Sequence, residues 1–416
     1  MQACYTSRMD GTGLYPLPET PPAVTRGSYR LFGAFRLILA LMVVLQHLQY
    51  LLPDALRGPF HQMGFGALAV GVFFALSGFI VAEANDSFYA GRPGAFLLNR
   101  LLRVVPPYLA ALAISAAVHA VLWRAGRLAL WDFVLGRDPL DPALLAAGVL
   151  SLLPGFHTSY VAQDFEYIPF VWTLRVEMAF YLAAVAVAAS MGRAGRARAW
   201  VPAAAVGAGF AGFALYVWQG GPGLLSDVPF FLVGVCLYAA LRRPVLLRGA
   251  AVMLAAVCAM AAFPHWDQRG LPVLSMQMPA LAALVAALAV LAAWPQVTPR
   301  WRRLDRRLGA LSYPLYLNHY AVGIALYDTV PERGVAVYAA GIGLSVALAW
   351  AMHRLVEAPM DRLRTRVRGA RSEAGSKVEA LPQTPPKACL WNPLLSNSVW
   401  RGLGLWRVWA EPSLAC

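Results

Sequence analysis

An arginine and a histidine stand eleven residues apart in an otherwise apolar stretch, RLILALMVVLQH, which runs from Arg36 to His47. Eleven residues of α-helix advance by about 16 Å and turn through about 1,100°, close to three full turns. The two side chains therefore share one face of a helix at two depths. Because ionisable groups inside a membrane face a bundle interior or a wet cavity, the spacing predicts a polar pathway. Arg36 lies at its cytoplasmic edge, and His47 is a candidate general base near mid-membrane.

A second basic pair, Arg100 and Arg103, lies in the stretch FLLNRLLRVVPPYL. Residues three apart share one face of a helix, and two guanidiniums side by side form a fork that suits phosphate. The alternative interpretation is that the pair only anchors a helix end at the cytoplasmic side of the membrane.

A carboxylate enters the membrane in FVWTLRVEMAFYL, which contains Trp172, Arg175 and Glu177 at the outer start of a predicted span. Such a carboxylate is costly unless it is paired or used. Residues two apart on a helix do not face each other, so Arg175 is not expected to neutralise Glu177. We therefore predict a functional role for Glu177, and Trp172 and Arg175 beside it are candidate substrate-binding residues.

Another histidine, His319, lies in LGALSYPLYLNHYAV, eleven residues into a predicted span. It is a candidate substrate-binding residue, and the alternative is a hydrogen-bonded core histidine. The small residues of GVFFALSGFI, residues 71–80, would let helices approach closely. We expect the candidate side chains to surround one cavity: His47, Glu177 and His319 inside it, and Arg36, Arg100 and Arg103 at its cytoplasmic mouth.

The elements that must position these side chains are membrane helices. The chain has 416 residues, of which 59% are hydrophobic and 13% charged, whereas a soluble domain carries about 25% charged residues. With roughly 20 apolar residues per span, the sequence predicts an all-α, polytopic helical bundle of about ten transmembrane helices. Their expected ranges are 34–52, 63–83, 104–122, 175–191, 200–218, 227–241, 250–263, 273–294, 308–328 and 335–353. The apolar run 144–153 is short, so interfacial, re-entrant and spanning interpretations all stay open.

The basic residues indicate topology. The net charge is +14, and lysine occurs only at Lys377 and Lys387. One alternating set of connections holds 23 arginines and the other holds seven. Positive charge marks the cytoplasmic side, which places both termini there. The charge thus fits membrane lipid as a partner and not nucleic acid.

Three regions follow from composition. Residues 1–30 form a polar cytoplasmic leader, residues 31–368 form the transmembrane domain, and residues 369–416 form a cytoplasmic tail of a composition typical of disorder. The five cysteines have no metal-binding spacing, so no metal and no bound cofactor are expected.

The motifs, taken in order, resemble those of the acyltransferase-3 family of bacterial membrane acyltransferases, which includes O-antigen and exopolysaccharide O-acetylases. They are an arginine and a histidine with ten residues between them, FFALSGF, RLLR before PPY, the tryptophan–glutamate motif, SYPLYLNH and HRLVEAPMDRL. The resemblance extends from Gly33 to Arg364. Two departures concern acceptor preference: TLRVE replaces the more frequent SLSVE, and Gly71 stands where Asp is common.

This resemblance implies an O-acyltransferase in the bacterial cytoplasmic (inner) membrane that uses acyl-CoA, most simply acetyl-CoA, as co-substrate. It implies a glycan or glycolipid acceptor on the far side. By position, His47 and Glu177 become the catalytic candidates, and Arg36, Arg100 and Arg103 become the donor-binding candidates. Direct transfer and a covalent acyl-enzyme both stay open.

Two other classes of function compete with this interpretation. An exporter or flippase could use the same charges as a substrate path, but it predicts inverted halves, and the sequence has no internal symmetry. A non-catalytic subunit of a polysaccharide assembly machine would need the spans but neither His47 nor Glu177. Transfer of radiolabel from acetyl-CoA to an acceptor separates the three.

Overall fold

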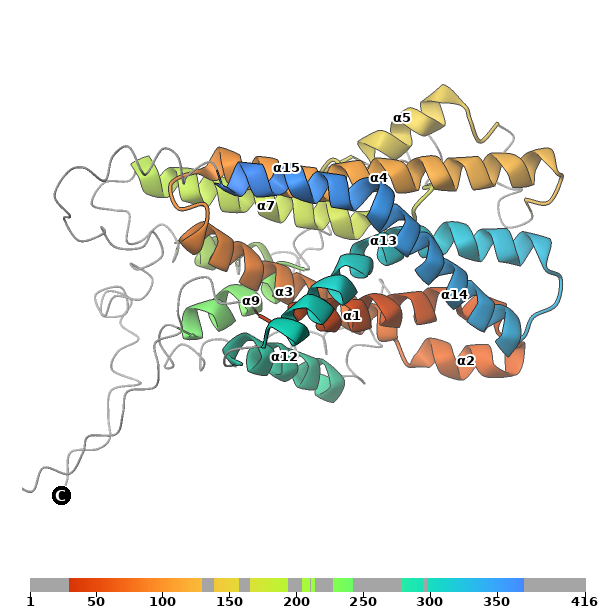
Figure 1. Cartoon of the computed structure of the whole chain (residues 1–416), viewed down its shortest axis with the longest axis horizontal. Helices are drawn as coiled ribbons and strands as arrows, with labels where there is room; N and C mark the ends of the chain where they lie inside the picture. The colour runs from red at the N-terminus through yellow and green to blue at the C-terminus, as the bar shows by residue number, and fades with distance from the viewer. Residues whose placement is uncertain are drawn as a thin grey trace, which may run out of the picture.

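The computed structural model describes residues 30–128, 138–156, 165–193, 204–209, 211–213, 227–241, 278–294 and 298–369. Within these ranges the regular secondary structure is helical throughout, and the long helices run roughly side by side (Figure 1). The predicted all-α, polytopic fold is confirmed. Apart from Arg30 and Gly369, the leader and the tail lie outside the described residues, as does the predicted span 250–263.

Five described helical stretches are long and apolar enough to cross a membrane. The first two are Phe32–Leu51, made of α1 (Phe32–His47) and the 3-10 turn η1 (Leu48–Leu51), and Asp54–Ser87, made of α2 (Asp54–Gln62) and α3 (Phe65–Ser87). The next two are Pro93–Arg124, which is α4, and Val171–Met191, which lies within α7 (Val171–Arg193). The fifth is Val335–Gly369, made of α14 (Val335–Met352), the π-helical turn η7 (His353–Glu357) and α15 (Ala358–Gly369).

Four other helices complete the described part of the bundle. The helices α9, Val228–Ala240, and α12, Met278–Ala293, are apolar but shorter. The helix α13, Pro299–Thr329, begins with a basic segment and continues into the predicted span 308–328. The helix α5, Pro142–Leu150, has nine residues and is therefore about 14 Å long, which is too short to span the membrane.

The crossing of α1 and α13 depends on Gly33. A Cβ atom at this position would lie 1.9 Å from the carbonyl oxygen of Asp305, so only glycine permits the approach. The Asp305 carboxylate accepts hydrogen bonds from the backbone N–H groups of Gly33, at 2.9 Å, and Ala34, at 2.7 Å. Because N–H groups in a first helical turn lack partners within the helix, this contact caps α1 and fixes the depth of the Arg36–His47 face against α13.

The crossing of α3 and α9 explains the small residues of FFALSGF. A Cβ atom at Gly78 would lie 2.0 Å from the carbonyl oxygen of Phe231. The backbones of the two helices therefore touch on this side of α3. The side chain of Ser77, the preceding residue, instead reaches α7 and bonds Glu177 there.

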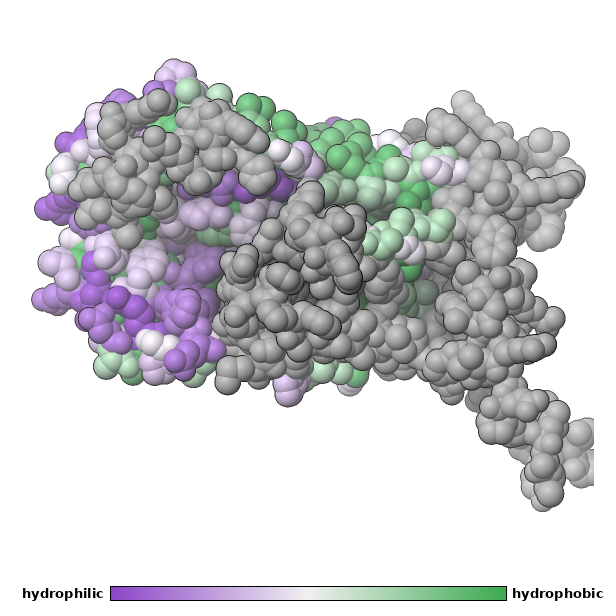
Figure 2. Space-filling view, turned by 180° about the vertical axis from the view of Figure 1, so that it is seen from behind, coloured by the Kyte–Doolittle hydropathy of each residue, from purple (hydrophilic) through white to green (hydrophobic). Residues whose placement is uncertain are grey.

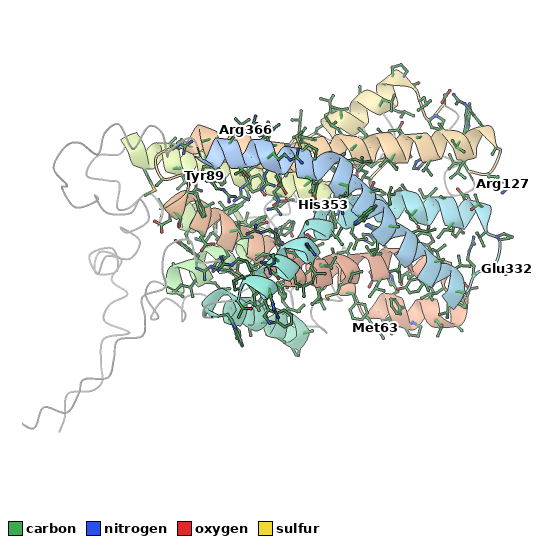
Figure 3. All side chains as sticks on the ribbon, viewed as in Figure 1. Met63, Tyr89, Arg127, Glu332, His353 and Arg366 are labelled. Carbon is green, nitrogen blue, oxygen red and sulfur yellow. The ribbon has the colours of Figure 1, made fainter. Side chains whose placement is uncertain are left out.

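The last helix, α15, lies along the first half of α4 (Figure 1). The Asn99 amide donates to the Arg364 carbonyl at 3.0 Å, and Arg92 donates to the Val367 carbonyl at 3.1 Å. Tyr89 and Arg366 lie at this end of the molecule, and Arg127 and Glu332 lie at the opposite end (Figure 3). The α3–α4 connection and the end of α15 therefore share one end of the bundle.

The surface changes character along the bundle. In the view of Figure 2, hydrophilic side chains gather at one end, and hydrophobic side chains appear toward the middle of the described surface. This distribution suits a bundle that crosses a membrane, because hydrocarbon requires an apolar band.

Candidate functional site

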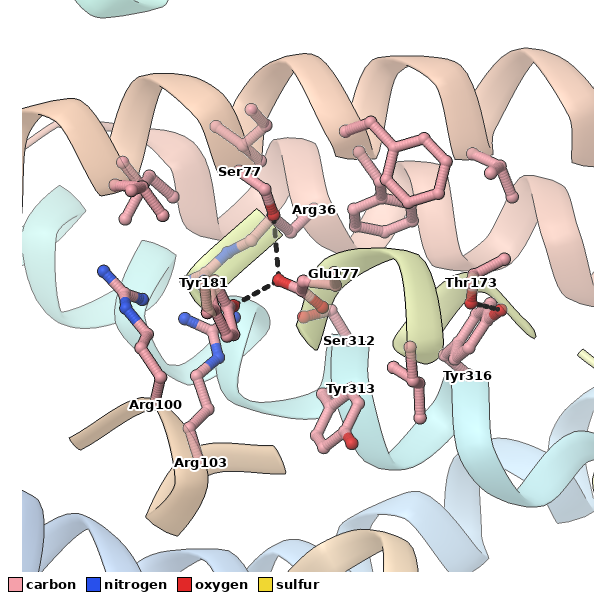
Figure 4. Close-up of a pocket in the computed structure, with 17 residues that line it drawn as sticks. Arg36, Ser77, Arg100, Arg103, Thr173, Glu177, Tyr181, Ser312, Tyr313 and Tyr316 are labelled. Atoms are coloured by element: carbon pink, nitrogen blue, oxygen red, sulfur yellow. Dashed lines mark hydrogen bonds between the residues drawn. The ribbon is translucent and has the colours of Figure 1, made fainter. Parts of the chain in front are cut away.

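Five helices enclose a polar pocket in the interior (Figure 4). Its polar lining comes from α1, α3, α4, α7 and α13, and α7 contributes the carboxylate, Glu177. The lining side chains with polar atoms are Arg36, Ser77, Arg100, Arg103, Thr173, Glu177, Tyr181, Ser312, Tyr313 and Tyr316. Three guanidiniums therefore face one carboxylate among the residues that line the pocket.

The Glu177 carboxylate lies at the middle of this pocket, between the Arg100–Arg103 pair and Thr173 (Figure 4). The Ser77 hydroxyl donates a hydrogen bond to it at 2.9 Å, and the Tyr181 hydroxyl, one turn further along α7, donates another. Both hydroxyl donors bond the same oxygen, Oε1 of Glu177. They thereby hold the carboxyl group among the guanidiniums that line the pocket.

Arg100 is held by aromatic rings. Its side chain is only 5% exposed, and its guanidinium lies 5.2 Å from the Phe96 ring and 5.5 Å from the Tyr181 ring. The Nε atom is buried without a hydrogen-bond partner among the described residues. A buried cation with an open donor favours an anionic ligand, since an unpaired buried charge is costly.

Arg103 lies one turn further along α4 and shares the pocket with Arg100. It is within electrostatic reach of two carboxylates, Glu177 and Glu357 of the π-helical turn η7. The Tyr313 hydroxyl donates to the Val104 carbonyl at 3.0 Å and thereby ties α13 to α4 beside Arg103. The basic pair is thus positioned by α4, α7, α13 and η7 together.

His47 and His319 form a separate cluster. Nδ1 of His47 lies 2.9 Å from Nε2 of His319, and the two rings stack with centroids 5.1 Å apart. The Phe170 ring stacks on both, at 5.3 Å from His47 and 4.6 Å from His319. Neither histidine lines the pocket that holds Glu177.

Two hydroxyl side chains lie between the Glu177 pocket and the histidine pair. The Thr173 and Tyr316 hydroxyls are 2.6 Å apart, and Tyr316 also donates to the Phe170 carbonyl at 3.1 Å. Thr173 and Tyr316 form the pocket end opposite the basic pair (Figure 4), and Phe170 covers the histidines beyond them.

The pocket that contains Glu177 therefore does not include the two histidines, in contrast to the expected single cavity. Glu177 lies with the arginines, whereas the ring partner of His47 is His319. The physical reason is depth: His47 is about 16 Å beyond Arg36 along α1, which carries it past the Thr173–Tyr316 layer.

Arg175 and Trp172 lie outside the pocket. Arg175 forms an ion pair of 2.9 Å with Glu166 and donates to the Phe156 carbonyl at 2.7 Å. This agrees with the argument that Arg175 does not face Glu177. Trp172 is 42% exposed and touches the Phe74 ring edge-on, with centroids 6.5 Å apart.

Hydroxyl side chains are the part of the site that the sequence analysis missed. Thr173, Glu177 and Tyr181 recur every four residues on α7, and Ser312 and Tyr316 do so on α13. Residues four apart lie on one helical face. This four-residue spacing was the signal in the sequence, since it places Thr173 and Tyr181 one turn before and one turn after Glu177 on the same face of α7.

Comparison with known proteins gives a family. A curated relative, protein 2 in the picA locus of Rhizobium radiobacter, is 47% identical over 62 residues, which are 14% of this chain and 32% of that protein. The chain thus matches about a third of that relative's length. No solved structure matches the chain. The family model described as an acyltransferase domain matches residues 32–354, which include all three pocket arginines, Glu177 and both paired histidines. This chain belongs to the acyltransferase-3 family.

Proposed function

We propose that this multi-pass membrane protein is an O-acyltransferase. It moves an acyl group, most simply acetyl, from cytoplasmic acyl-CoA to a hydroxyl of an extracytoplasmic acceptor, a sugar of a surface polysaccharide or glycolipid. The observation that carries the proposal is a pocket lined by three arginines next to a contacting pair of histidines, with α1 and α13 contributing to both.

The arginine pocket suits the donor. CoA is polyanionic, and arginine forms bidentate hydrogen bonds with phosphate. Arg100 and Arg103 lie toward the end of the bundle where α4 begins, the end that the positive-inside rule assigns to the cytoplasm. The narrow pantetheine arm then extends past Glu177 toward the Thr173–Tyr316 layer. In this arrangement Glu177 orders the guanidiniums and the donor and does not contact the base.

The histidine pair suits the acceptor. An acceptor hydroxyl has a pKa far above 7, so a base must remove its proton as the new bond forms. In the direct route, His47 takes this proton and the hydroxyl oxygen bonds the thioester carbonyl carbon. The C–S bond breaks, and the departing thiolate receives the proton from His47, which releases CoA as a thiol. An acyl-enzyme route uses the same base twice.

The test is a transfer assay on purified protein in liposomes with radiolabelled acetyl-CoA and candidate glycans. Wild-type protein should label the acceptor, and His47→Ala should lose about 10²–10⁴-fold in rate. Ile38→Ala is the matched control, because Ile38 lies on the same helix and is 53% exposed.

The outcomes separate the three classes of function. An exporter moves unlabelled glycan across the liposome membrane without a covalent change. A non-catalytic subunit labels no acceptor in the wild-type form. Activity of His47→Ala at the wild-type rate, with equal protein in the membrane, would refute the base assignment.

A further inference from the structure

The hydrogen bonds of His319 define which of its nitrogens carries the proton. Nδ1 of His319 lies 3.3 Å from the Leu315 carbonyl oxygen. A carbonyl oxygen only accepts, so Nδ1 is the N–H donor. A neutral imidazole has one N–H group, and Nε2 of His319 is therefore a hydrogen-bond acceptor.

The same logic then applies to His47. Its Nδ1 lies 2.9 Å from Nε2 of His319, and an acceptor requires a donor opposite. Nδ1 of His47 thus carries the hydrogen. This leaves Nε2 of His47 with a free lone pair, which is the form that a general base needs.

The free nitrogen lies near a glycine. A Cβ atom built on Gly66, in the first turn of α3, would lie 4.0 Å from Nε2 of His47 and 3.3 Å from the Gln46 side chain. The absence of a side chain at Gly66 thus keeps α3 from filling this position beside Nε2. An acceptor hydroxyl must come within about 2.6–3.2 Å of the base, and a glycine at this point favours such an approach.

We propose that His319 is a positioning residue that fixes the tautomer of His47, so that Nε2 of His47 takes the acceptor proton beside Gly66. This inference rests on the proposed acyl transfer. It gives His319 the role that the carboxylate has in a serine–histidine–aspartate triad, which is to hold the imidazole in one tautomer and orientation. It replaces the expectation that His319 binds substrate.

The burial of His319 supports a positioning role. The side chain is 0% exposed, and the Phe170 ring covers it at 4.6 Å with an interplanar angle of 13°. No acceptor can reach the ring while Phe170 is in place. Its one polar contact outside its own helix among the described residues is the contact with His47.

Two substitutions at His319 separate positioning from packing. Gln retains an oxygen that accepts from Nδ1–H of His47, whereas Leu fills the space without an acceptor. We expect His319→Gln to stay within about tenfold of wild-type kcat and His319→Leu to lose about 10²-fold. The KM for acetyl-CoA should not change, because neither histidine lines the arginine pocket. Equal or greater kcat for Leu than for Gln, at matched protein amounts, overturns the proposal.

A spectroscopic experiment tests the tautomer without any transfer. Isotope-labelled histidine in the purified full chain is observed by nitrogen NMR at neutral pH, and the His47 signals are assigned by their loss in His47→Gln. We expect a protonated Nδ1 and an unprotonated Nε2 in the wild type, and loss of this preference in His319→Leu. The opposite tautomer overturns the inference. A wild-type chain with the expected tautomer but no transfer to any acceptor refutes the proposed function instead.

The space beside Gly66 has its own test. Gly66→Ala places a methyl group 3.3 Å from Gln46 and 4.0 Å from Nε2 of His47, so it should raise the acceptor KM severalfold and leave the donor KM unchanged. Gly343→Ala on α14 is the control, since a Cβ there meets nothing within 4 Å. An unchanged acceptor KM in Gly66→Ala contradicts the placement of the acceptor.

Discussion

Replacing Arg100 and Arg103 together by glutamine removes two buried positive charges from the proposed donor compartment while keeping polar side chains of similar length. Hydrogen bonds to charged groups are worth about 1.5–3 kcal/mol each. Since about 1.4 kcal/mol is a tenfold change in affinity, each single substitution should raise the donor KM about tenfold or more. The double substitution should raise it about a hundredfold.

Other contacts of the two arginines also bear on the expected rise in the donor KM. Arg100 stacks near Phe96 and Tyr181, so its loss also removes cation–π contacts of about 0.5–2 kcal/mol. Glu177 keeps its two hydroxyl donors, Ser77 and Tyr181, and therefore does not become unsatisfied. The double variant should insert and fold, although the remaining carboxylate would now repel a polyanion.

The assay compares two thioester donors, acetyl-CoA and S-acetylpantetheine, which lacks the phosphates. The double variant should show the raised KM with acetyl-CoA alone. Arg366→Gln is the control, since Arg366 is an exposed arginine on α15 at the same end of the bundle (Figure 3). If both donors are affected equally, or if neither is, the arginines do not bind phosphate and the reasoning fails.

Three further outcomes follow from contacts in the bundle. Glu177→Gln keeps a hydrogen-bond acceptor for the Ser77 and Tyr181 hydroxyls but removes the carboxylate that faces the arginines. The kcat with acetyl-CoA should therefore fall at least tenfold, while the amount of folded protein stays near that of the wild type. An unchanged kcat would mean that Glu177 has a structural role only. Tyr316→Phe removes the 2.6 Å hydrogen bond with Thr173. It should increase the acceptor-independent hydrolysis of acetyl-CoA severalfold, measured as free thiol. A lower rate of hydrolysis would mean that Thr173 and Tyr316 do not separate the arginine pocket from the histidine pair. Gly33→Ala forces a Cβ to within 1.9 Å of the Asp305 carbonyl oxygen, so the thermal unfolding midpoint of this variant in detergent should fall by several degrees. The control Gly343→Ala should unfold near the wild-type temperature. Equal midpoints for the two variants would mean that α1 and α13 do not cross so closely.

Hydropathy predicted the membrane helices better than it predicted their ends. The expected span 104–122 belongs to α4, which begins at Pro93, and the expected span 308–328 belongs to α13, which begins at Pro299. Both extensions carry arginines, and a hydropathy pattern stops at charged residues although a helix does not. Pro106 and Pro314 also lie within these helices.

The motifs supplied most of the charged site residues, but the sequence could not supply their partners. Glu177 bonds Ser77, one hundred residues earlier, and Asp305 caps Gly33 from a distance of 272 residues in the chain. Spacing within one helix sets the direction and depth of a side chain on that helix only. It does not set how far one helix is displaced along another. This displacement decides that Glu177 lies with the arginines and apart from the two histidines.

The helices α1 and α13 each contribute to the pocket and to the histidine pair: Arg36 and His47 come from one, and Tyr316 and His319 from the other. A displacement of either helix as a whole would therefore reach both the arginine pocket and the histidine pair, and any coupling between two ligands that results from it is reciprocal. Substitutions of single side chains, such as His319→Leu and Gly66→Ala, leave these helices in place and for that reason should leave the donor KM unchanged.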